Sequence, residues 1–380
     1  MNKNVPLYLD YNATAPLLPE VKAAMAEALA LTGNPSSIHG SGRNARKHVE
    51  QAREQIAKLV NCDPTHVTFT SGATESNNWV LFGAPVKRIL VSAIEHPSLL
   101  DAAKEKNNAE IIPVTKDGVI DTDALEKMLT QSDEKTLVCA MWVNNETGVI
   151  QPIEKISEIC AKHAGLLHVD AVQAAGRLPI DLKKIKIDYL ALSAHKIGGP
   201  AGIGALIYDH DTTLAKFIHG GGQERRRRAG TENTLGIIGF GFAAATAQQT
   251  QKNYAQLGQW RNAMEARLKA TLPGLVVAGE NAPRVGNTSQ IILPGVASEK
   301  QLMALDLAGV HVSSGSACSS GSVKPSHVLL AMGVPESMAA CAIRVSTGPF
   351  SDEKDLHSLE KALLSVFPLG VAKTSRLTHD

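Results

Sequence analysis

The stretch from His168 to Lys196 constrains the fold and chemistry of this chain more than any other. It connects two apolar segments, Leu166–Val169 and Ile187–Leu192, which their length and composition predict to be strands. Polar residues follow each segment, namely Asp170 and Gln173 after the first and Ser193, His195 and Lys196 after the second. Because open α/β sheets bind ligands at the carboxyl ends of their strands, we expect these side chains to share one ligand site.

A lysine and an aspartate at such a site suggest pyridoxal phosphate. This cofactor needs an amine to hold its aldehyde as a Schiff base and a carboxylate to keep its ring nitrogen protonated. Lys196 and Asp170 are the candidates for these two roles. A single lysine after a strand is also commonly a solvated cap, so the hypothesis depends on the rest of the chain.

Composition limits the class of protein. With 380 residues, the chain can form one large α/β domain and a smaller one. Its 38 Lys and Arg against 37 Asp and Glu give no electrostatic argument for nucleic acid or an anionic membrane. We expect a cytoplasmic protein, because no apolar run reaches the length of a membrane span and the N-terminus lacks a signal-peptide core. The five cysteines contain no CxxC pair, which favours free thiols over disulfides or a metal site.

Strands and helices alternate through the first part of the chain, which predicts a mostly parallel sheet. The predicted strands include 67–69, 88–93 and 136–143, and the helices include 20–31 and one with a stripe from Ala45 to Leu59. A long helical stretch, 234–272, is expected to bend at Gly236, Gly239 and Gly241. The remainder predicts an α+β segment with strands 289–293, 310–312 and 342–346, helix 299–307, and a last helix that begins at a Ser351 cap.

Two further strand ends carry candidate ligand contacts. The turn through Ser71-Gly72 leads into a helix whose free N–H groups, with the Thr74 hydroxyl, suit a phosphate. A plain capped helix gives the same pattern. His96 follows another strand, where its ring can stack on a planar cofactor and move protons, or can serve the proline turn after it.

The polar segment 219–233 contains four consecutive arginines, Arg225 to Arg228. It lacks the interleaved aromatic residues and flanking basic clusters of a nucleic-acid site. A surface or subunit contact, in a loop that reaches an anion, fits it better.

The loop SSGSACSSGSVKPSHVL, residues 313–329, resembles the catalytic loop of NifS-like cysteine desulfurases, in the class V aminotransferase group of pyridoxal phosphate enzymes. YLDYNATAP, TSGATESNN, HVDAVQAAG with SAHKIGGPAGIG, and GGGQERRRRAGTEN match the same family in the same order. The long serine-rich loop is similar to group I of the family. The sequence departs from the pattern of the family in two places, the fuller arginine run and a proline in Gly348-Pro349-Phe350. We expect these two differences to affect contacts with partners more than the chemistry.

The resemblance implies fold type I, an α/β fold with a large domain on a mostly parallel seven-stranded sheet and a smaller α+β domain. The large domain would span 13–251, and 1–12 with 252–380 would form the small domain that carries the cysteine loop. It also implies a homodimer that passes sulfur to an acceptor protein such as an iron-sulfur scaffold. From the composition we expect no membrane and no direct nucleic-acid partner.

The resemblance also implies a role for each matching residue. Lys196 would hold the cofactor, Asp170 would pair with its ring nitrogen, Gln173 would contact its phenolic oxygen, and His96 would stack on its ring. Its phosphate would be bound by Ala73, Thr74, Ser193 and His195, with Thr231 from the other subunit. Asn34, Asn145 and Arg344 would hold the substrate carboxylate, and Cys318 would accept the sulfur.

The expected reaction follows from these roles. L-cysteine displaces Lys196, the freed amine removes the α-proton, and the Cys318 thiolate attacks the substrate sulfur to give a persulfide and alanine. Two other classes remain open. An aminotransferase or selenocysteine lyase would share the Lys196 site without needing Cys318, and a non-enzymatic sulfur carrier would need no Schiff base. An ordinary surface cysteine in a flexible loop is the alternative for Cys318 itself.

Overall fold

A seven-stranded sheet, in the order β2-β8-β7-β6-β5-β3-β4, forms the centre of the larger part of the molecule. The computed structural model describes residues 6–209, 211–314 and 325–366. Neighbours from β4 to β7 run parallel, whereas β8 runs antiparallel to both β7 and β2. The strands are β2 (Val67–Thr70), β3 (Arg88–Ser92), β4 (Ala109–Ile112), β5 (Thr136–Met141), β6 (Leu166–Asp170), β7 (Tyr189–Ser193) and β8 (Gly204–Ile207). The predicted α/β fold with a mostly parallel sheet is confirmed.

Helices cover both faces of this sheet because successive side chains of each strand alternate between two apolar clusters. Leu90 and Val138 pack on one face and their neighbours Val91 and Leu137 on the other. The first face is covered by α2 (Gly40–Val60), α5 (Thr122–Thr130), α6 (Ile153–Lys162) and α7 (Thr234–Thr250), and the second by α3 (Ala73–Gly83) and α4 (Pro97–Lys104). The predicted stripe of α2 is buried in the first cluster, and α1 (Pro19–Ala28) lies along α7.

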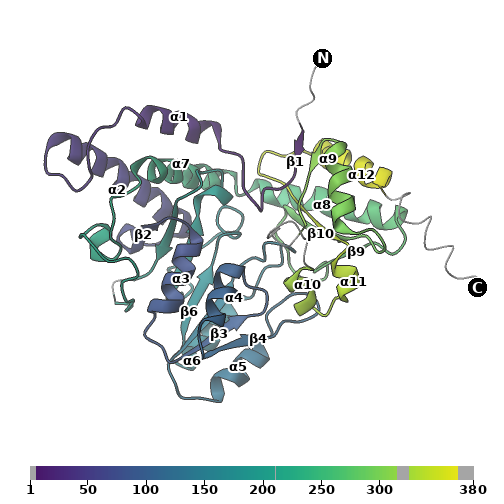
Figure 1. Ribbon diagram of the computed structural model, residues 1–380, viewed down its shortest axis with the longest axis horizontal. Helices are drawn as coiled ribbons and strands as arrows, with labels where there is room; N and C mark the ends of the chain where they lie inside the picture. Colours follow the sequence, from purple (N-terminus) through teal and green to yellow (C-terminus); the bar gives the residue numbers. More distant parts are fainter. Residues whose placement is uncertain (1–5, 210, 315–324, 367–380) are drawn as a thin grey trace, which may run out of the picture.

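A second group of elements lies beside the large one and has its own core (Figure 1). Here β10 (Thr288–Ile292) pairs antiparallel with β12 (Ala342–Ser346) and β9 (Val276–Val277), and β1 (Leu7–Tyr8) pairs parallel with β11 (Val310–His311). The helices are α8 (Asn253–Thr271), α9 (Ser298–Leu307), α10 (His327–Ala331), α11 (Glu336–Ala339) and α12 (Glu353–Val366).

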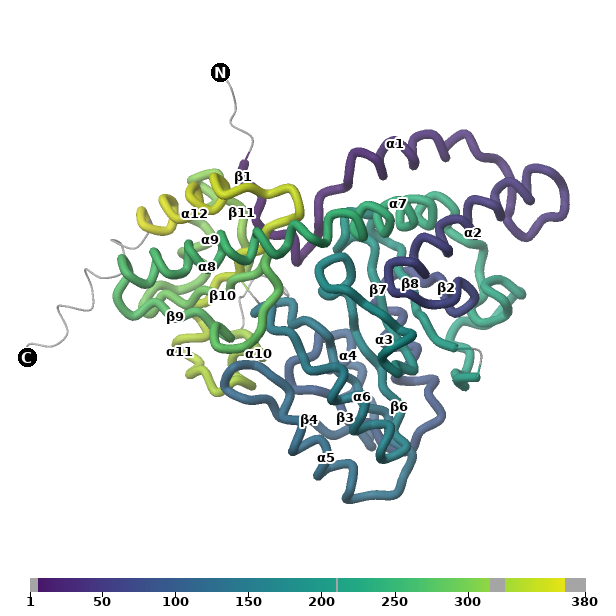
Figure 2. The backbone as a smooth tube through the Cα atoms, turned by 180° about the vertical axis from the view of Figure 1, so that it is seen from behind, coloured from purple at the N-terminus to yellow at the C-terminus, as the bar shows by residue number. Residues whose placement is uncertain are grey.

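The N-terminal strand therefore joins elements from the other end of the chain, as Figure 2 shows. Leu9 is fully buried in this second core, with Ile291, Ile343 and Leu359. The separate core supports a division of the chain into two domains. The boundaries predicted for them, after residues 12 and 251, stay a prediction.

The prediction of one helix bent at Gly236, Gly239 and Gly241 is wrong. Residues 234–250 form α7, and the break comes later, at Gln251 and Lys252, before α8. A Cβ at Gly241 would lie 2.7 Å from Cα of Ala52 in α2, and one at Gly239 would lie 2.9 Å from Cγ of Pro200. These glycines let neighbouring segments approach α7 closely, which is a packing role and does not require a bend.

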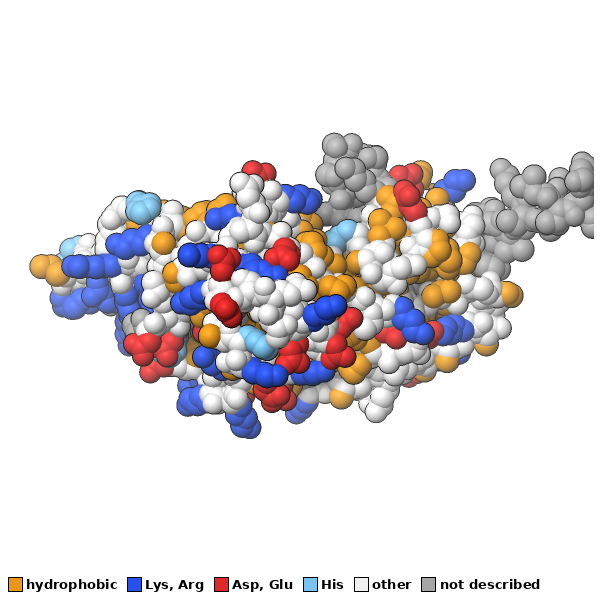
Figure 3. Space-filling model, turned by 90° about the horizontal axis from the view of Figure 1, so that it is seen from below, with side chains coloured by type: hydrophobic (Ala, Val, Ile, Leu, Met, Phe, Trp, Pro, Cys, Tyr) orange, Lys and Arg blue, Asp and Glu red, His pale blue; other side chains and the backbone are white. Residues whose placement is uncertain are grey.

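Other predicted boundaries shift by one to three residues. The first helix ends at Ala28 and not at Leu31, and β5 ends at Met141 and not at Val143. Within the described ranges, no helix is both long and apolar enough to cross a membrane. On the face in Figure 3, Lys and Arg side chains are interspersed with Asp and Glu.

Candidate active site

A cavity of about 710 Å³ opens at the carboxyl ends of β5, β6 and β7. Parallel strands bring their carboxyl ends to one edge, so residues distant in sequence meet there. The second group of elements contributes Arg344 of β12 and the residues Ser313 and Ser314 after β11. Among its lining residues are most of the predicted site, namely Ala73, Thr74, His96, Asn145, Asp170, Gln173, Ser193, His195, Lys196 and Arg344.

Lys196 ends the 3₁₀ turn Ala194–Lys196 that follows β7. Its Nζ donates hydrogen bonds to the carbonyl oxygens of Asn12, at 2.8 Å, and Ala13, at 2.7 Å. Burial, with the positive charges of Arg344 and Arg177, lowers the pKa of Lys196 to about 8. The uncharged amine, the form that reacts with a carbonyl group, is therefore far more populated near neutral pH than in an ordinary lysine.

Asp170 ends β6 and its carboxylate is held by two donors. Oδ2 accepts from Nδ2 of Asn77 at 2.8 Å, and Oδ1 accepts from the backbone N–H of Val172 at 3.0 Å. The amide oxygen of Asn77 lies 2.9 Å from Nε2 of the fully buried His168. Burial lowers the pKa of His168 to about 4, so this imidazole is neutral and donates from Nε2 to Asn77.

His96 caps α4 at the cavity wall. Its Nδ1 accepts from the backbone N–H of Ser98 at 3.1 Å, which leaves the proton of the neutral ring on Nε2. The ring is exposed at the cavity, yet the surrounding protein lowers its pKa through desolvation, helped by Lys196 and His327 and opposed by Asp170. A neutral, flat ring therefore lines the cavity.

Ala73 and Thr74 form the first turn of α3, whose leading N–H groups have no partner within the helix. Ser193 and His195 lie beside them along the cavity wall. Nδ1 of His195 lies 3.2 Å from Oγ1 of Thr14, and burial, with the charge of Lys196, lowers the pKa of His195 to about 4. This end of the cavity presents N–H and hydroxyl donors that suit an anion.

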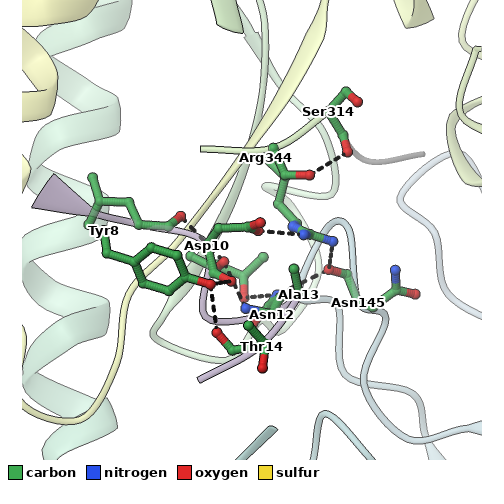
Figure 4. Close-up of polar contacts among 12 residues, drawn as sticks. Tyr8, Asp10, Asn12, Ala13, Thr14, Asn145, Ser314 and Arg344 are labelled. Atoms are coloured by element: carbon green, nitrogen blue, oxygen red, sulfur yellow. Dashed lines mark hydrogen bonds and ion pairs between the residues drawn. The ribbon is translucent and has the colours of Figure 1, made fainter. Parts of the chain in front are cut away.

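Arg344 points from β12 toward Asp10 and Asn145, as Figure 4 shows. Nη2 forms an ion pair with Oδ1 of Asp10 at 2.7 Å, and Nη1 donates to the carbonyl oxygen of Asn145 at 3.2 Å. Its Nε is buried without a partner. The guanidinium thus keeps donor capacity for a carboxylate at the side of the cavity formed by the second core.

Three predicted site residues lie outside this constellation. Asn34 is exposed, and its side chain accepts from the backbone N–H of Ser36 at 2.8 Å. Thr231 lines a separate cavity of about 200 Å³. Cys318 lies outside the described residues, although Ser314 and Pro325, the described residues on either side of its segment, line the main cavity.

Sequence reasoning missed several residues that support this site. Asp10 and Asn12 lie in the YLDYNATAP segment and Asn77 lies in TSGATESNN, but only their long-range contacts reveal their roles. Glu146 is buried at the cavity wall and accepts a hydrogen bond from Ser326. Burial raises the pKa of Glu146, against the opposing effects of Ser326, His327 and Arg344.

The residues present fit pyridoxal phosphate. The cavity volume lies within the range of about 300 to 1,000 Å³ that is usual for small-molecule sites. Lys196 offers an amine with a lowered pKa, Asp170 offers a carboxylate on the adjacent strand, and a helix N-terminus offers anion-binding groups. The described residues include no cluster of His, Cys, Asp and Glu side chains arranged to hold a metal ion.

Comparisons with known proteins agree with this geometry. Residues 7–359 match the family described as aminotransferase class-V. The chain is 40% identical over 363 residues to cysteine desulfurase IscS of Dictyoglomus turgidum, with 92% of each chain covered. It is 41% identical to a cysteine desulfurase of Sinorhizobium fredii, over 95% of this chain and 96% of the relative.

A solved structure gives the same result for the fold. The X-ray structure of a NifS-like protein from Rickettsia africae superimposes with a TM-score of 0.88 and 36% identity, covering 96% of this chain and 99% of that one. The chain therefore belongs to the aminotransferase class-V family of pyridoxal phosphate enzymes, and within it to the cysteine desulfurases.

Proposed function

We propose that this enzyme converts L-cysteine to L-alanine and retains the removed sulfur as a persulfide on Cys318. In the net reaction the bond between the β-carbon and the sulfur of the substrate breaks, a sulfur–sulfur bond to Cys318 forms, and the β-carbon gains a proton in place of the one that the Cys318 thiol loses. One observation carries the proposal. The Lys196 amine and the Asp170 carboxylate follow adjacent parallel strands and line one cavity.

In this proposal the cavity residues hold the cofactor along its length. Lys196 would bind the aldehyde, Asp170 would pair with the ring nitrogen, Gln173 would contact the phenolic oxygen and His96 would lie on the ring. Pyridoxal phosphate, when bound, accepts the electrons that remain after the α-proton leaves. The phosphate would be bound by Ala73, Thr74, Ser193 and His195, with Thr231 of the partner subunit.

Chain residues would carry the proton and orient the substrate. The Lys196 amine, once free, would remove the α-proton of L-cysteine, because its lowered pKa leaves it uncharged in a useful fraction of molecules. Arg344 would hold the substrate carboxylate by charge-assisted hydrogen bonds, with Asn34 and Asn145 as further contacts. Asn34 lies away from the cavity of its own chain, so its contact needs either a partner subunit or a movement of its loop.

Cys318 would receive the sulfur. The described residues on either side of its segment, Ser314 and Pro325, both line the cavity, which supports access of that segment to the substrate. Three of the other cysteines are poor alternatives. Burial raises the pKa of the thiol in Cys62 and in Cys160 to about 12, and raises that of Cys139 well above its ordinary value, so these side chains stay protonated.

The quaternary structure and partners extend the same proposal. A homodimer would account for Thr231, which lines a different cavity in its own chain. The large domain would comprise residues 13–251, and 1–12 with 252–380 would form the small domain that carries Cys318. A cytoplasmic acceptor protein, such as an iron-sulfur scaffold, would receive the sulfur, without a membrane or nucleic-acid partner.

The test is sulfide and alanine production from L-cysteine with a reductant, using wild type, Lys196→Ala, Cys318→Ala and the matched control Cys62→Ala. We expect equal amounts of both products from wild type and Cys62→Ala, and neither from the other two. Only Lys196→Ala should lose the absorption band near about 400 nm of the bound cofactor. Full desulfurase activity in Cys318→Ala would remove Cys318 from the mechanism, and a wild type that stays colourless with added cofactor would refute the site.

A further inference from the structure

Arg177 is a buried cation without an acidic partner. Its side chain is 4% exposed, and Nη1 donates to the carbonyl oxygen of Gln173 at 2.9 Å and also to Oε1 of that residue. Its Nε has no hydrogen-bond partner. Tyr254, which is uncharged at neutral pH, is its other polar neighbour, and no Asp or Glu of the described ranges forms an ion pair with it. Such a charge is costly to bury, and an apolar side chain would serve the fold better.

A short hydrogen-bonded chain connects Arg177 to the reactive amine. Arg177 donates to the amide oxygen of Gln173, and Nε2 of Gln173 donates to the carbonyl oxygen of Asn12 at 3.0 Å. The same carbonyl oxygen accepts from Nζ of Lys196 at 2.8 Å. Arg177 and Lys196 also line one small cavity of about 140 Å³, distinct from the main cavity. Because the guanidinium itself is buried, solvent screens its charge only weakly.

The other charges near Lys196 are partly balanced. Arg344 forms an ion pair with Asp10 at 2.7 Å, which offsets much of its field. Arg177 lacks such compensation. Two positive groups, Arg344 and Arg177, oppose protonation of the amine, and two carboxylates, Asp170 and Asp10, favour it. The other titratable groups that face the amine are the neutral imidazoles of His96 and His195.

We propose that Arg177 is a positioning residue whose charge opposes protonation of the Lys196 amine, and whose hydrogen bond fixes the orientation of the Gln173 amide. Because Arg177 donates to Oε1, the NH₂ group of Gln173 is left as the donor on the side of Asn12 and the main cavity. This inference rests on the proposed role of Lys196. It adds that the buried charge of Arg177, and not burial alone, prepares the Lys196 amine to react.

The test measures the protonation of Lys196 directly, in the full chain freed of cofactor. Trace acetic anhydride labels uncharged amines, and mass spectrometry of the Lys196 peptide across pH gives the midpoint for this residue. We compare wild type, Arg177→Met, Arg177→Gln and the charge-retaining Arg177→Lys. Arg46→Met is the matched control, because Arg46 also donates to a backbone carbonyl oxygen, that of Pro35 at 2.8 Å, but lies on the exposed face of α2.

Removal of a positive neighbour favours the charged amine, so both uncharged variants should raise the labelling midpoint by about one pH unit. Arg177→Lys and Arg46→Met should keep the wild-type midpoint. The pH dependence of cofactor uptake, followed by absorbance, should shift in the same direction. An unchanged midpoint in Arg177→Met would overturn the inference. If both uncharged variants failed to fold while Arg177→Lys folded, the charge would serve the fold and the inference would also fall.

Failure of this inference can be distinguished from failure of the proposed function. A wild type that produces alanine and sulfide, with a labelling midpoint that does not change when Arg177 is replaced, would refute this inference alone. A chain without desulfurase activity, whose Lys196 labelling midpoint still rises when Arg177 is replaced by an uncharged residue, would refute the proposed function but not the effect of Arg177 on the amine.

Discussion

Asn77 joins Asp170 to His168 through the two ends of its side-chain amide. Nδ2 donates to Oδ2 of Asp170 at 2.8 Å, and Oδ1 accepts from Nε2 of His168 at 2.9 Å. Asn77 lies on α3 and both partners lie on β6, so this contact fixes the helix against the strand that carries the carboxylate. All three side chains are buried, and each relies on the others for hydrogen bonding.

We therefore expect Asn77→Ala to cost about 1 to 3 kcal/mol in unfolding free energy, because it leaves buried polar groups without a partner. It should also weaken cofactor binding, since Asp170 loses a donor that orients it. Equilibrium unfolding in urea and titration with pyridoxal phosphate measure the two effects. Asn78→Ala is the control, because Asn78 bonds the carbonyl oxygens of Thr74 and Ser98 and does not touch Asp170. Equal cofactor affinity in wild type and Asn77→Ala would contradict the positioning role.

The buried carboxyl group of Glu95 should make the folded protein less stable as pH rises. Its Oε1 accepts from the backbone N–H of Met141 at 2.6 Å, while Oε2 is buried without a partner. Burial raises the pKa of Glu95 well above its ordinary 4.5, and nearby Asp170 adds to this. The folded protein thus holds a proton that the unfolded chain releases above pH 4.5, so the contribution of Glu95 to stability is full at lower pH and is lost as pH rises.

Glu95→Gln should remove this loss, because the amide cannot ionise. We expect the variant to be more stable than wild type at pH 8 by about 1 to 3 kcal/mol, and the difference to shrink toward pH 5. Urea unfolding at both pH values, with equal cofactor occupancy, gives the comparison. The exposed Glu105 on the same segment provides the control Glu105→Gln, which should change little at either pH. A difference that stays constant between pH 5 and pH 8 would rule out ionisation of Glu95 as its cause.

The loop that leads to Thr231 is held by a buried ion pair. Glu224, Arg225 and Arg226 adopt φ values of 45°, 56° and 66°, which are unfavourable for residues other than glycine. Arg53 binds both carboxylate oxygens of Glu224, at 2.9 and 3.0 Å, and the backbone N–H of Phe69 donates to Oε2 at 2.9 Å. These contacts compensate for the strained backbone.

Glu224→Ala should therefore destabilise the protein by about 3 kcal/mol, because Arg53 loses its buried partner and keeps only the more exposed Glu50, at 3.2 Å, as an acidic contact. The double variant Arg53→Met/Glu224→Leu should recover part of that loss, since no unpaired charge remains. Urea unfolding of Glu224→Leu, Arg53→Met and the double variant beside wild type measures the coupling. If the double variant loses as much free energy of unfolding as the two single variants together, the ion pair is not the source of the effect.

The sequence alone predicted the elements with strong local patterns. The stripe from Ala45 to Leu59 is regular enough to specify α2, and polar residues after apolar strands were sufficient to locate the cavity. The polar network beneath the cavity could not be predicted. Arg344 pairs with Asp10 across 334 positions and Lys196 bonds Asn12 across 184, and no periodicity encodes contacts of that separation.

The partners of the arginines in the run Arg225 to Arg228 could not be predicted from the sequence either. Its composition favours a surface or subunit contact, but the guanidinium carbon of Arg227 lies 4.2 Å from the centre of the Tyr208 ring and Arg228 pairs with Glu75 at 3.0 Å. Part of the run therefore fixes the loop to its own chain. Consecutive like charges give no sign of such separate partners, because each side chain points to a different element.

Arg344 gives the last prediction. Nη2 of its guanidinium binds Asp10 and Nη1 binds the carbonyl oxygen of Asn145, in a geometry that depends on the planar guanidinium. A lysine would keep the charge but could not bind two acceptors and a substrate carboxylate in one plane. If Arg344 holds that carboxylate, Arg344→Lys should raise KM for L-cysteine by about tenfold or more, with a smaller change in kcat.

Steady-state kinetics with L-cysteine test this, together with the cofactor absorption band, which should be unchanged if Arg344 holds the substrate and not the cofactor. Arg267→Lys is the matched control, since Arg267 pairs with Glu360 at 2.9 Å away from the cavity and should leave KM as in wild type. A fall in kcat at unchanged KM would place Arg344 in the chemical step and not in substrate binding. The ion pair with Asp10 makes that distinction possible, because Asp10→Asn frees the same guanidinium without removing it and should lower KM.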